Sequence, residues 1–317
     1  MSDNERFLVG AYGLGKNLLP LVHSEEQIGN KLFFRRLSIR SGDEVVSTPV
    51  ISGNSFRGAW RDLAAMHLMQ ALSVKGVSKE LFGVFFSGGM LTQETKVEFG
   101  NKLYGLFPTL RLFGFCMGST MYASRIGVDF AVPLTAGTMS YAEAAYPKLA
   151  CPSTKLEASD ITGMTMLTRK DDEDKAILID VEIQEAEAPG PTQMLFHVEY
   201  VVPNTTFVHG FRSMYPLSPL ELGALLKVLE LSSDRSYGGM GSRGFGKMNW
   251  TYTIETFDRP GGADPKPKTV KVGNEVAFDP TLKEYKQMYE DYVAGLAATL
   301  QADEDFANIL QFKRVTR

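Results

Sequence analysis

Two separated segments of the chain carry the residue types that bind a phosphate backbone. Residues 48–61 and residues 238–247 each combine glycines, small hydroxyl or amide side chains, and arginine close to an aromatic residue. Glycine lets the main chain approach a ligand closely, arginine pairs with phosphate oxygens, and an aromatic ring stacks on a base. We therefore predict that the two segments come together in the folded protein as one RNA-holding surface.

The first segment opens a predicted amphipathic helix. Apolar side chains recur at helical spacing over residues 54–72, and residues 52–54 are suited to a helix start. Arg57 and Arg61 are four residues apart, so they share one face near the start, where backbone amides and the helix dipole favour an anion. A phosphate site is the favoured interpretation, and an ordinary helix start with solvated arginines is the alternative.

The second segment matches two well-known glycine patterns, and its context argues against both. Residues 239–244 fit the G-x-G-x-x-G dinucleotide fingerprint, and residues 241–247 fit most of a P-loop. Both motifs follow a strand and open a helix, whereas this loop follows a predicted helix and opens a strand. Met248 also stands where a P-loop requires serine or threonine. A structural turn is the remaining alternative, but the glycines that surround Arg243 and Phe245 favour close approach to a ligand.

The overall charge limits this interpretation. The 317-residue chain has a formal net charge of −4 at pH 7, which argues against binding nucleic acid through bulk charge alone. Screening at physiological salt confines each field to roughly 8–10 Å, so local charge can outweigh the total. The clustered cations are Lys31, Arg35, Arg36, Arg40, Arg57 and Arg61, while acidic residues gather at 171–174 and 303–305.

Other functional classes find little support in the sequence. The four histidines share no ligand spacing and the two cysteines cannot build a structural zinc site alone, so we expect no metal and no cofactor. No stretch approaches the roughly 18 apolar residues of a membrane span, and residues 1–6 do not resemble a secretion signal. We therefore expect a soluble, cytoplasmic protein.

The order of the predicted elements favours an α+β fold. Ser218 and Glu221 form a capping box with Pro219 at the first helical position, which predicts a helix to about residue 231. Residues 248–254 alternate as a half-buried strand does. The remaining expected elements are a strand and bend over residues 6–23, a long functional loop over 23–47, a β-rich run over 125–134, a projecting hairpin over 162–191 with a strand at 177–183, a strand over 194–202, a linker over 259–268 and a helix over about 282–300. This order suits helices packed on one side of an antiparallel sheet.

At these residues the sequence resembles the RAMP superfamily of CRISPR proteins, specifically the seventh-class Cas backbone subunit, and most closely its version from type IV effector complexes. The resemblance is carried by residues 49–61, by Leu112-Phe113-Gly114 and by residues 238–247, in the order of that family. It covers most of residues 5–255. The C-terminal part, residues 259–317, lies outside it.

The resemblance implies an architecture and an activity. The expected fold is a modified ferredoxin-like (RRM-like) palm that bears a protruding β-hairpin thumb. Residues 1–161 and 192–258 would form the palm, residues 162–191 the thumb, and residues 259–317 a linker and C-terminal helix. Copies of such a subunit stack as a helical filament along the guide RNA (crRNA), and each thumb flips out a base at regular intervals.

The resemblance also implies site residues and partners. Arginines would hold phosphates, and thumb methionines would wedge between bases. The candidate RNA-binding residues are Arg35, Arg36, Ser52, Asn54, Ser55, Arg57, Arg61, Met164, Met166, Gly239, Gly241, Ser242, Arg243 and Phe245. The expected partners are the crRNA, further copies of this chain, target nucleic acid that pairs with the guide, a fifth-class RAMP subunit, a sixth-class guide-processing endonuclease, a large subunit and a DinG-family helicase.

An enzyme remains the main alternative. Related type III backbone subunits cleave target RNA with an aspartate in the loop before the first helix. The corresponding loop here offers Glu25, Glu26, Asp43 and Glu44, and its one aspartate does not align clearly with the family's position. We therefore expect a non-catalytic subunit, with a metal-dependent endoribonuclease and an interaction protein that binds no RNA as the alternatives.

Overall fold

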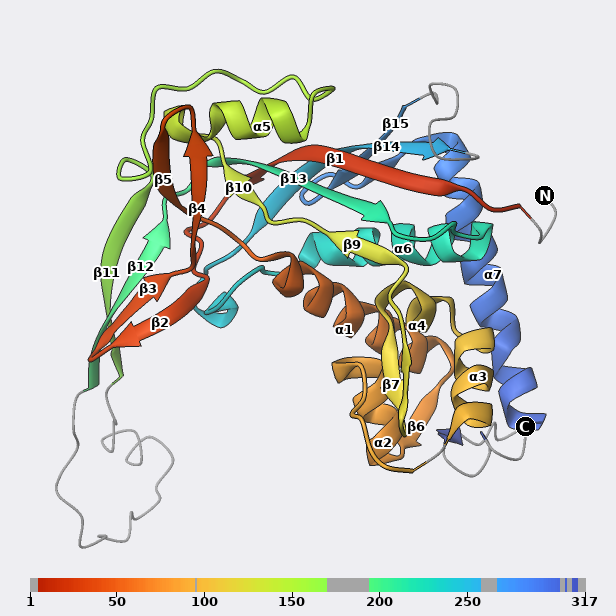
Figure 1. The fold of residues 1–317 in the computed structure, drawn as a ribbon. Helices are drawn as coiled ribbons and strands as arrows, with labels where there is room; N and C mark the ends of the chain where they lie inside the picture. The colour runs from red at the N-terminus through yellow and green to blue at the C-terminus, as the bar shows by residue number, and fades with distance from the viewer. Residues whose placement is uncertain are drawn as a thin grey trace, which may run out of the picture.

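The computed structural model describes residues 5–94, 96–169, 194–257, 267–302, 306 and 310–312 of the chain (Figure 1). Its centre is a seven-stranded sheet in the order β10-β13-β1-β14-β15-β16, with β9 also paired to β13. The strands are β1 (Leu8–Asn17), β9 (Ile126–Val128), β10 (Val132–Pro133), β13 (Thr206–Ser213), β14 (Met248–Phe257), β15 (Lys268–Val272) and β16 (Ala277–Phe278).

The central strands and two helices follow the ferredoxin-like path. In chain order they are β1, α1 (Gly53–Ala71), the β9–β10 run, β13, α6 (Pro219–Leu231) and β14. The spatial order β10-β13-β1-β14, with antiparallel pairing throughout, places the first strand between the third and the fourth. The α+β prediction with a ferredoxin-like antiparallel sheet is confirmed.

Each face of the sheet is covered differently. Figure 1 shows α1 and α6 on one face and the short helix α5 (Met139–Ala145) on the other. The hairpin of β4 (Arg36–Ser41) and β5 (Glu44–Pro49) joins α5, so Ile39 and Val50 share a small core with Val132 and Ala142. The expectation of helices on one side therefore holds for α1 and α6, and α5 is an addition to it.

The alternation of β1 explains how the main core closes. Val9 and Ala11 point toward α1 and α6. Gly15 lies opposite Trp250 on the adjacent strand β14, and a Cβ atom on Gly15 would lie 2.2 Å from the indole ring. The missing side chain therefore makes the space that the large ring of the neighbouring strand fills.

Aromatic rings fasten α1 to this face of the sheet. Phe56 of α1 stacks on His209 of β13 with ring centroids 4.2 Å apart, and it meets Trp250 edge-on. His209 is fully buried, and its Nδ1 lies 2.8 Å from the hydroxyl of Tyr252. Burial lowers the pKa of His209 to about 3, so the ring is neutral at physiological pH.

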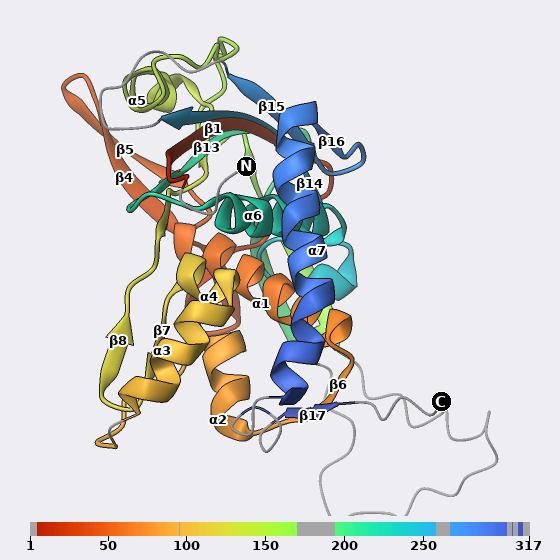
Figure 2. The ribbon, with the colours of Figure 1, turned by 90° about the vertical axis from the view of Figure 1, so that its right-hand side faces the viewer.

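A helical lobe lies beyond the C-terminal end of α1. It contains β6 (Val74–Val77), α2 (Lys79–Phe82), α3 (Val97–Leu106), α4 (Pro108–Phe113), β7 (Phe115–Met117) and β8 (Thr120–Tyr122). The expected C-terminal helix is α7 (Pro280–Ala302), which runs past α6 toward this lobe (Figure 2). Gly223 lets α6 and α7 approach each other closely, since a Cβ there would lie 2.0 Å from the carbonyl oxygen of Tyr285 on α7. Strand β17 (Leu310–Phe312) pairs with β6.

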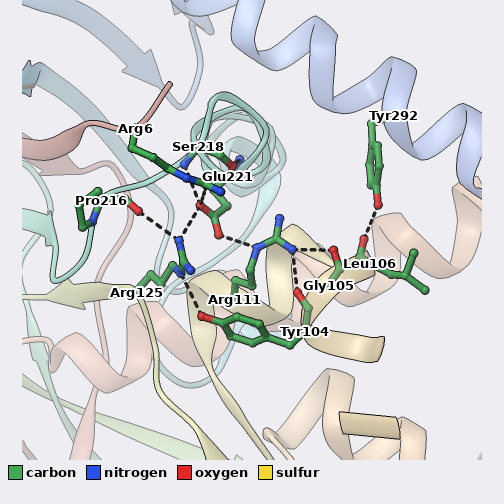
Figure 3. A network of polar contacts seen from close by, with 10 residues as sticks. All are labelled: Arg6, Tyr104, Gly105, Leu106, Arg111, Arg125, Pro216, Ser218, Glu221 and Tyr292. Atoms are coloured by element: carbon green, nitrogen blue, oxygen red, sulfur yellow. Dashed lines mark hydrogen bonds and ion pairs between the residues drawn. The ribbon is translucent and has the colours of Figure 1, made fainter. Parts of the chain in front are cut away.

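The buried carboxylate of Glu221 ties α6 to this lobe (Figure 3). Arg111 of α4 donates Nε to one oxygen at 2.6 Å, and Arg125 donates Nη1 to the other at 3.2 Å. The amide of Ser218 donates to the same carboxylate at 2.8 Å, which completes the predicted capping box. One acidic side chain thus joins three parts of the chain and is fully hydrogen-bonded.

The prediction of a long loop over residues 23–47 is wrong. This stretch forms β2 (Ser24–Ile28), β3 (Lys31–Phe34), β4 and β5, with turns at Gly29 and Gly42, whose φ angles are +60° and +61°. Strand β3 pairs in parallel with β12 (Met194–Val201). Most of the pairing is local, β2 with β3 and β4 with β5, and only β3 has a partner far along the chain. The buried Phe34 and Ile39 stand among many polar residues, so the apolar pattern is weak in the sequence.

The predicted hairpin starts with a strand, but the described partner of that strand lies beyond the predicted bounds of 162–191, in residues that were assigned to the palm. Strand β11 (Thr162–Arg169) pairs with β12 in antiparallel register, and a four-stranded sheet follows in the order β11-β12-β3-β2. We call this the thumb sheet. The predicted strand at 177–183 and the acidic tip at 171–174 lie outside the described residues, as does the linker over 258–266.

Acid should weaken the fold through His209. Between pH 6.5 and about 3 the unfolded chain binds a proton at this residue and the folded chain does not, so stability falls as pH drops below 6.5. At pH 4.5 the loss is about 2–3 kcal/mol. Urea unfolding at pH 7 and pH 4.5 measures it, and His209→Phe should reduce the difference between the two pH values. An unchanged difference in the variant would contradict this assignment.

Candidate nucleic-acid interface

Residues 18–23, here called the connector, link the two predicted segments. Within it, Leu21 and Val201 exchange backbone hydrogen bonds, which attaches the connector to β12 of the thumb sheet. The amide of Gly239 donates to the carbonyl of Val22 at 2.7 Å, and the amide of Gly246 donates to that of Pro20 at 2.8 Å. The glycine-rich loop is thus attached to the same six residues as the thumb sheet.

The connector also reaches the start of α1. His23 places Nε2 3.3 Å from both the amide and the hydroxyl oxygen of Ser52, the residue that caps the helix. The amide of Arg35 donates to the His23 carbonyl at 2.7 Å. Burial lowers the pKa of His23, and Arg35 lowers it further, so the neutral ring that accepts from Ser52 is favoured. The two predicted segments therefore flank one connector.

Glycines of the loop serve two purposes. Gly238 and Gly246 have φ angles of +77° and +87°, and a Cβ on either would lie within 2.1 Å of a carbonyl oxygen. These two glycines are required by the turn itself. Gly239 and Gly241 are exposed, as are Ser242 and Arg243, although the amides of Gly239 and Arg243 are already used by the carbonyls of Val22 and Met240.

Phe245 and Arg243 divide the roles that the sequence analysis assigned to the loop. Phe245 is 8 % exposed and packs with Val22 and Val198, so its ring lies inside the protein rather than facing a ligand. Arg243 is exposed and lies over the ring of Phe196 on β12, 5.3 Å from its centroid. The loop therefore offers a cation and open backbone, and its aromatic residue fixes it to the thumb sheet.

Arg57 and Arg61 meet at a carbonyl oxygen. Their Nη2 atoms donate to the carbonyl of Phe113 at 2.7 and 2.8 Å, at the C-terminal end of α4. Gly114 allows this geometry, because its φ is +69° and a Cβ would lie 2.7 Å from neighbouring backbone. The Leu112-Phe113-Gly114 motif thus presents the acceptor for both arginines, a role that its sequence did not reveal.

The predicted arginines fall into two electrostatic groups. Arg35 pairs with Glu25 at 3.4 Å, and Arg36 pairs with Glu199 of β12. Within the described residues no carboxylate pairs with Arg57, Arg61 or Arg243. This difference separates locally neutralised cations from cations that are free to meet an external anion.

Arg57 and Arg61 are also partly buried. Burial lowers the pKa of both Arg57 and Arg61, and the pKa of Arg61 is lowered further by its neighbour. Their Nε atoms are buried without a hydrogen-bond partner. Two desolvated like charges near a single carbonyl are a costly arrangement, and an anion would relieve it. Asn54 is exposed and Ser55 half-buried at the start of the same helix.

The predicted thumb methionines are accessible. Met164 and Met166 are 47 % and 54 % exposed and lie on one face of β11, with Leu195 of β12 beside them. The opposite face carries Leu167 and Phe196, which pack against the glycine-rich loop. The two faces are thus distinct, and a contact between Met164 or Met166 and bases stays a prediction.

Sequence reasoning missed the residue that organises the connector. Asn17, at the end of β1, is fully buried, accepts from the amide of Thr205 and donates to the carbonyl of Val202. A polar residue that ends an apolar strand was its only signal in the sequence.

The structure gives no indication of a metal centre in the part of the chain that it describes, where no group of three or more His, Cys, Asp or Glu side chains lies close enough to hold an ion. Glu25 faces Arg35, and Asp43 faces Arg40 at 3.8 Å, so the acidic residues of 24–49 do not gather. No described helix is both long and apolar enough to span a membrane.

The fold and the interface together define an α+β protein with a ferredoxin-like palm, a thumb sheet and a cationic helix start. No protein-family model and no curated protein matches the chain. Among solved structures it is similar to a chain of a "Type IV-B CRISPR Complex", with a TM-score of 0.56, 16 % identity, and coverage of 81 % of this chain and 95 % of that chain. At this identity the likeness shows a shared fold.

Adjacent glycines of the loop provide a matched test of its geometry. Gly238→Ala should destabilise the protein by about 1–3 kcal/mol, because the methyl group meets the Val22 carbonyl at 2.0 Å and φ is positive. Gly239→Ala should change stability by less than about 0.5 kcal/mol, since its nearest neighbour lies at 3.9 Å. Urea unfolding measures both, and equal effects would show that the loop is not held as described.

Proposed function

We propose that this chain binds guide RNA as a non-catalytic backbone subunit of a type IV CRISPR ribonucleoprotein. The observation that carries the proposal is the set of three guanidinium groups, on Arg57, Arg61 and Arg243, that have no carboxylate partner among the described residues. They lie on the two segments that flank the connector. A phosphate backbone is the extended anion that matches several separated cations at once.

Each part of the interface has a role in this proposal. Arg57 and Arg61 hold phosphates with their remaining N–H groups, and Asn54 and Ser55 assist at the helix start. The exposed main chain of Gly241 and Ser242, with the Arg243 side chain and close approach at Gly239, holds the next part of the strand. Met164 and Met166 wedge between bases from the thumb sheet. Arg35 and Arg36 contribute less, because each is already paired.

Assembly follows from the length of the ligand. A guide strand is longer than one such interface, so successive copies of the chain bind side by side and form a filament. The solved chain of similar fold is part of a complex, which agrees with this arrangement. The further partners we propose are a fifth-class RAMP subunit, a sixth-class guide-processing endonuclease, a large subunit, a DinG-family helicase, and target nucleic acid recognised by base pairing.

The α1 arginines should determine the salt dependence of RNA binding. In filter binding of a short single-stranded RNA, the double variant Arg57→Gln/Arg61→Gln should lower the slope of log K against log salt by about one unit for each phosphate that the variant no longer binds. Arg243→Gln should lower it by about one unit without disturbing the fold, since the side chain is exposed. Arg40→Gln, an exposed arginine paired with Asp43, is the control. Binding that persists unchanged in both test variants would refute the interface.

Cleavage separates the proposed subunit from an endoribonuclease. The complex incubated with complementary RNA and Mg²⁺ should leave the RNA intact. Regularly spaced cuts that disappear with Glu25→Gln or Glu26→Gln would instead establish catalysis by this chain.

A further inference from the structure

A second cationic site lies at the other end of α6. The glycine-rich loop follows the C-terminal end of this 13-residue helix, and the Glu221 cluster surrounds its N-terminal end, about 20 Å away along the axis. In the sequence, Glu221 is recognisable only as a capping residue. The proposed guide interface does not use this cluster.

The cluster carries excess positive charge. Three arginines surround one carboxylate: Arg111 and Arg125 donate to Glu221, and Arg6 lies 3.5 Å from it. Arg111 turns its Nη1 to the carbonyls of Tyr104 and Gly105, so it is consumed within the fold. Arg6 and Arg125 therefore share one carboxylate that already accepts shorter hydrogen bonds from Arg111 and from the amide of Ser218, as Figure 3 shows.

A hollow opens beside these two arginines. It has a volume of about 370 Å³ and is lined by Arg6, Tyr104, Ala123, Arg125, Tyr215 and Pro216. Arg125 is held in place by the Tyr104 hydroxyl, which accepts from its Nε at 3.1 Å, and by the Pro216 carbonyl. The wall is thus rigid on the side of Arg125, whereas the Arg6 side chain is 48 % exposed.

An aromatic ring stands at the rim. Tyr215 is 53 % exposed, and no ring contact involves it in the described structure. An exposed ring next to guanidinium groups matches a flat aromatic body joined to an anion, because the ring stacks and the cations hold the charge. A volume of this size accommodates one such unit and exceeds what a lone carboxylate fills.

We propose that this hollow binds a nucleotide, with its phosphate between Arg6 and Arg125 and its base against Tyr215. The shared chemistry has two sources, a free mononucleotide and a nucleotide within a strand that runs past this end of the chain. The site is separate from the guide interface. It would give the chain a second contact with nucleic acid.

Calorimetric titration of the full chain with uridine monophosphate, adenosine monophosphate and inorganic phosphate tests the first source. Both nucleotides should bind more tightly than phosphate, and Arg6→Gln and Tyr215→Ala should each weaken binding about tenfold. Neither variant removes a short bond to Glu221, so the fold should be retained. Arg212→Gln, an exposed arginine paired with Asp129, is the control.

Crosslinking tests the second source. A 4-thiouridine-substituted RNA should form adducts at residues 214–216 that Tyr215→Ala removes, and such adducts without mononucleotide binding support the strand as the ligand. If neither adducts nor titration heats are observed, the inference is overturned. So would equal affinity for phosphate and nucleotides, or displacement only by an acidic peptide.

The guide-interface variant keeps the two proposals apart. In the background Arg57→Gln/Arg61→Gln/Arg243→Gln, nucleotide binding at the hollow should persist. If it is lost there but retained in Arg6→Gln, the nucleotide occupies the guide interface, and only this further inference fails.

Discussion

The packing of Phe56 and Trp60 against the central sheet is the interaction on which the arrangement of the interface depends. Trp60 is fully buried, and its indole Nε1 donates to the hydroxyl of Tyr237 at 3.2 Å. Tyr237 immediately precedes the glycine-rich loop, and its ring also contacts Phe56. The helix that carries Arg57 and Arg61 is thereby placed beside the loop that carries Arg243. Truncation of either ring to alanine would cost about 3–5 kcal/mol, so this packing outweighs the repulsion of like charges.

Local signals made part of this arrangement predictable. The capping box at Ser218 and the alternation around Trp250 each require only neighbouring residues, and both elements form where the sequence indicates. The strands over residues 24–49 were not predicted, because their buried apolar side chains, such as Phe34 and Ile39, stand among many polar ones. The position of β3 beside β12 also depends on pairing across a long stretch of chain. The interior position of Phe245 and the meeting of two arginines at Phe113 arise only from tertiary packing.

Charge is distributed in a way that composition conceals. Although the net charge of the chain is −4, carboxylates pair with Arg35 and Arg36 but, within the described residues, not with Arg57 and Arg61. Glu199 fixes Arg36 and also accepts from the amide of Phe34, so that ion pair serves the thumb sheet. Arg57 and Arg61 are held by a neutral carbonyl, which orients a guanidinium without cancelling its charge. Local orientation, rather than total charge, therefore decides which cations are available.

The connector gives the thumb sheet and the glycine-rich loop a common mount. Pro20 and Val22 hold the loop, Leu21 holds β12, and Leu18 donates to the carbonyl of Lys247 at 2.8 Å. The two parts are also packed on each other through Val22 and Phe245. The thumb sheet and the loop are therefore coupled, because both are attached to residues that directly follow the buried Asn17 at the end of β1. A displacement of β12 would be carried to the loop through these shared residues.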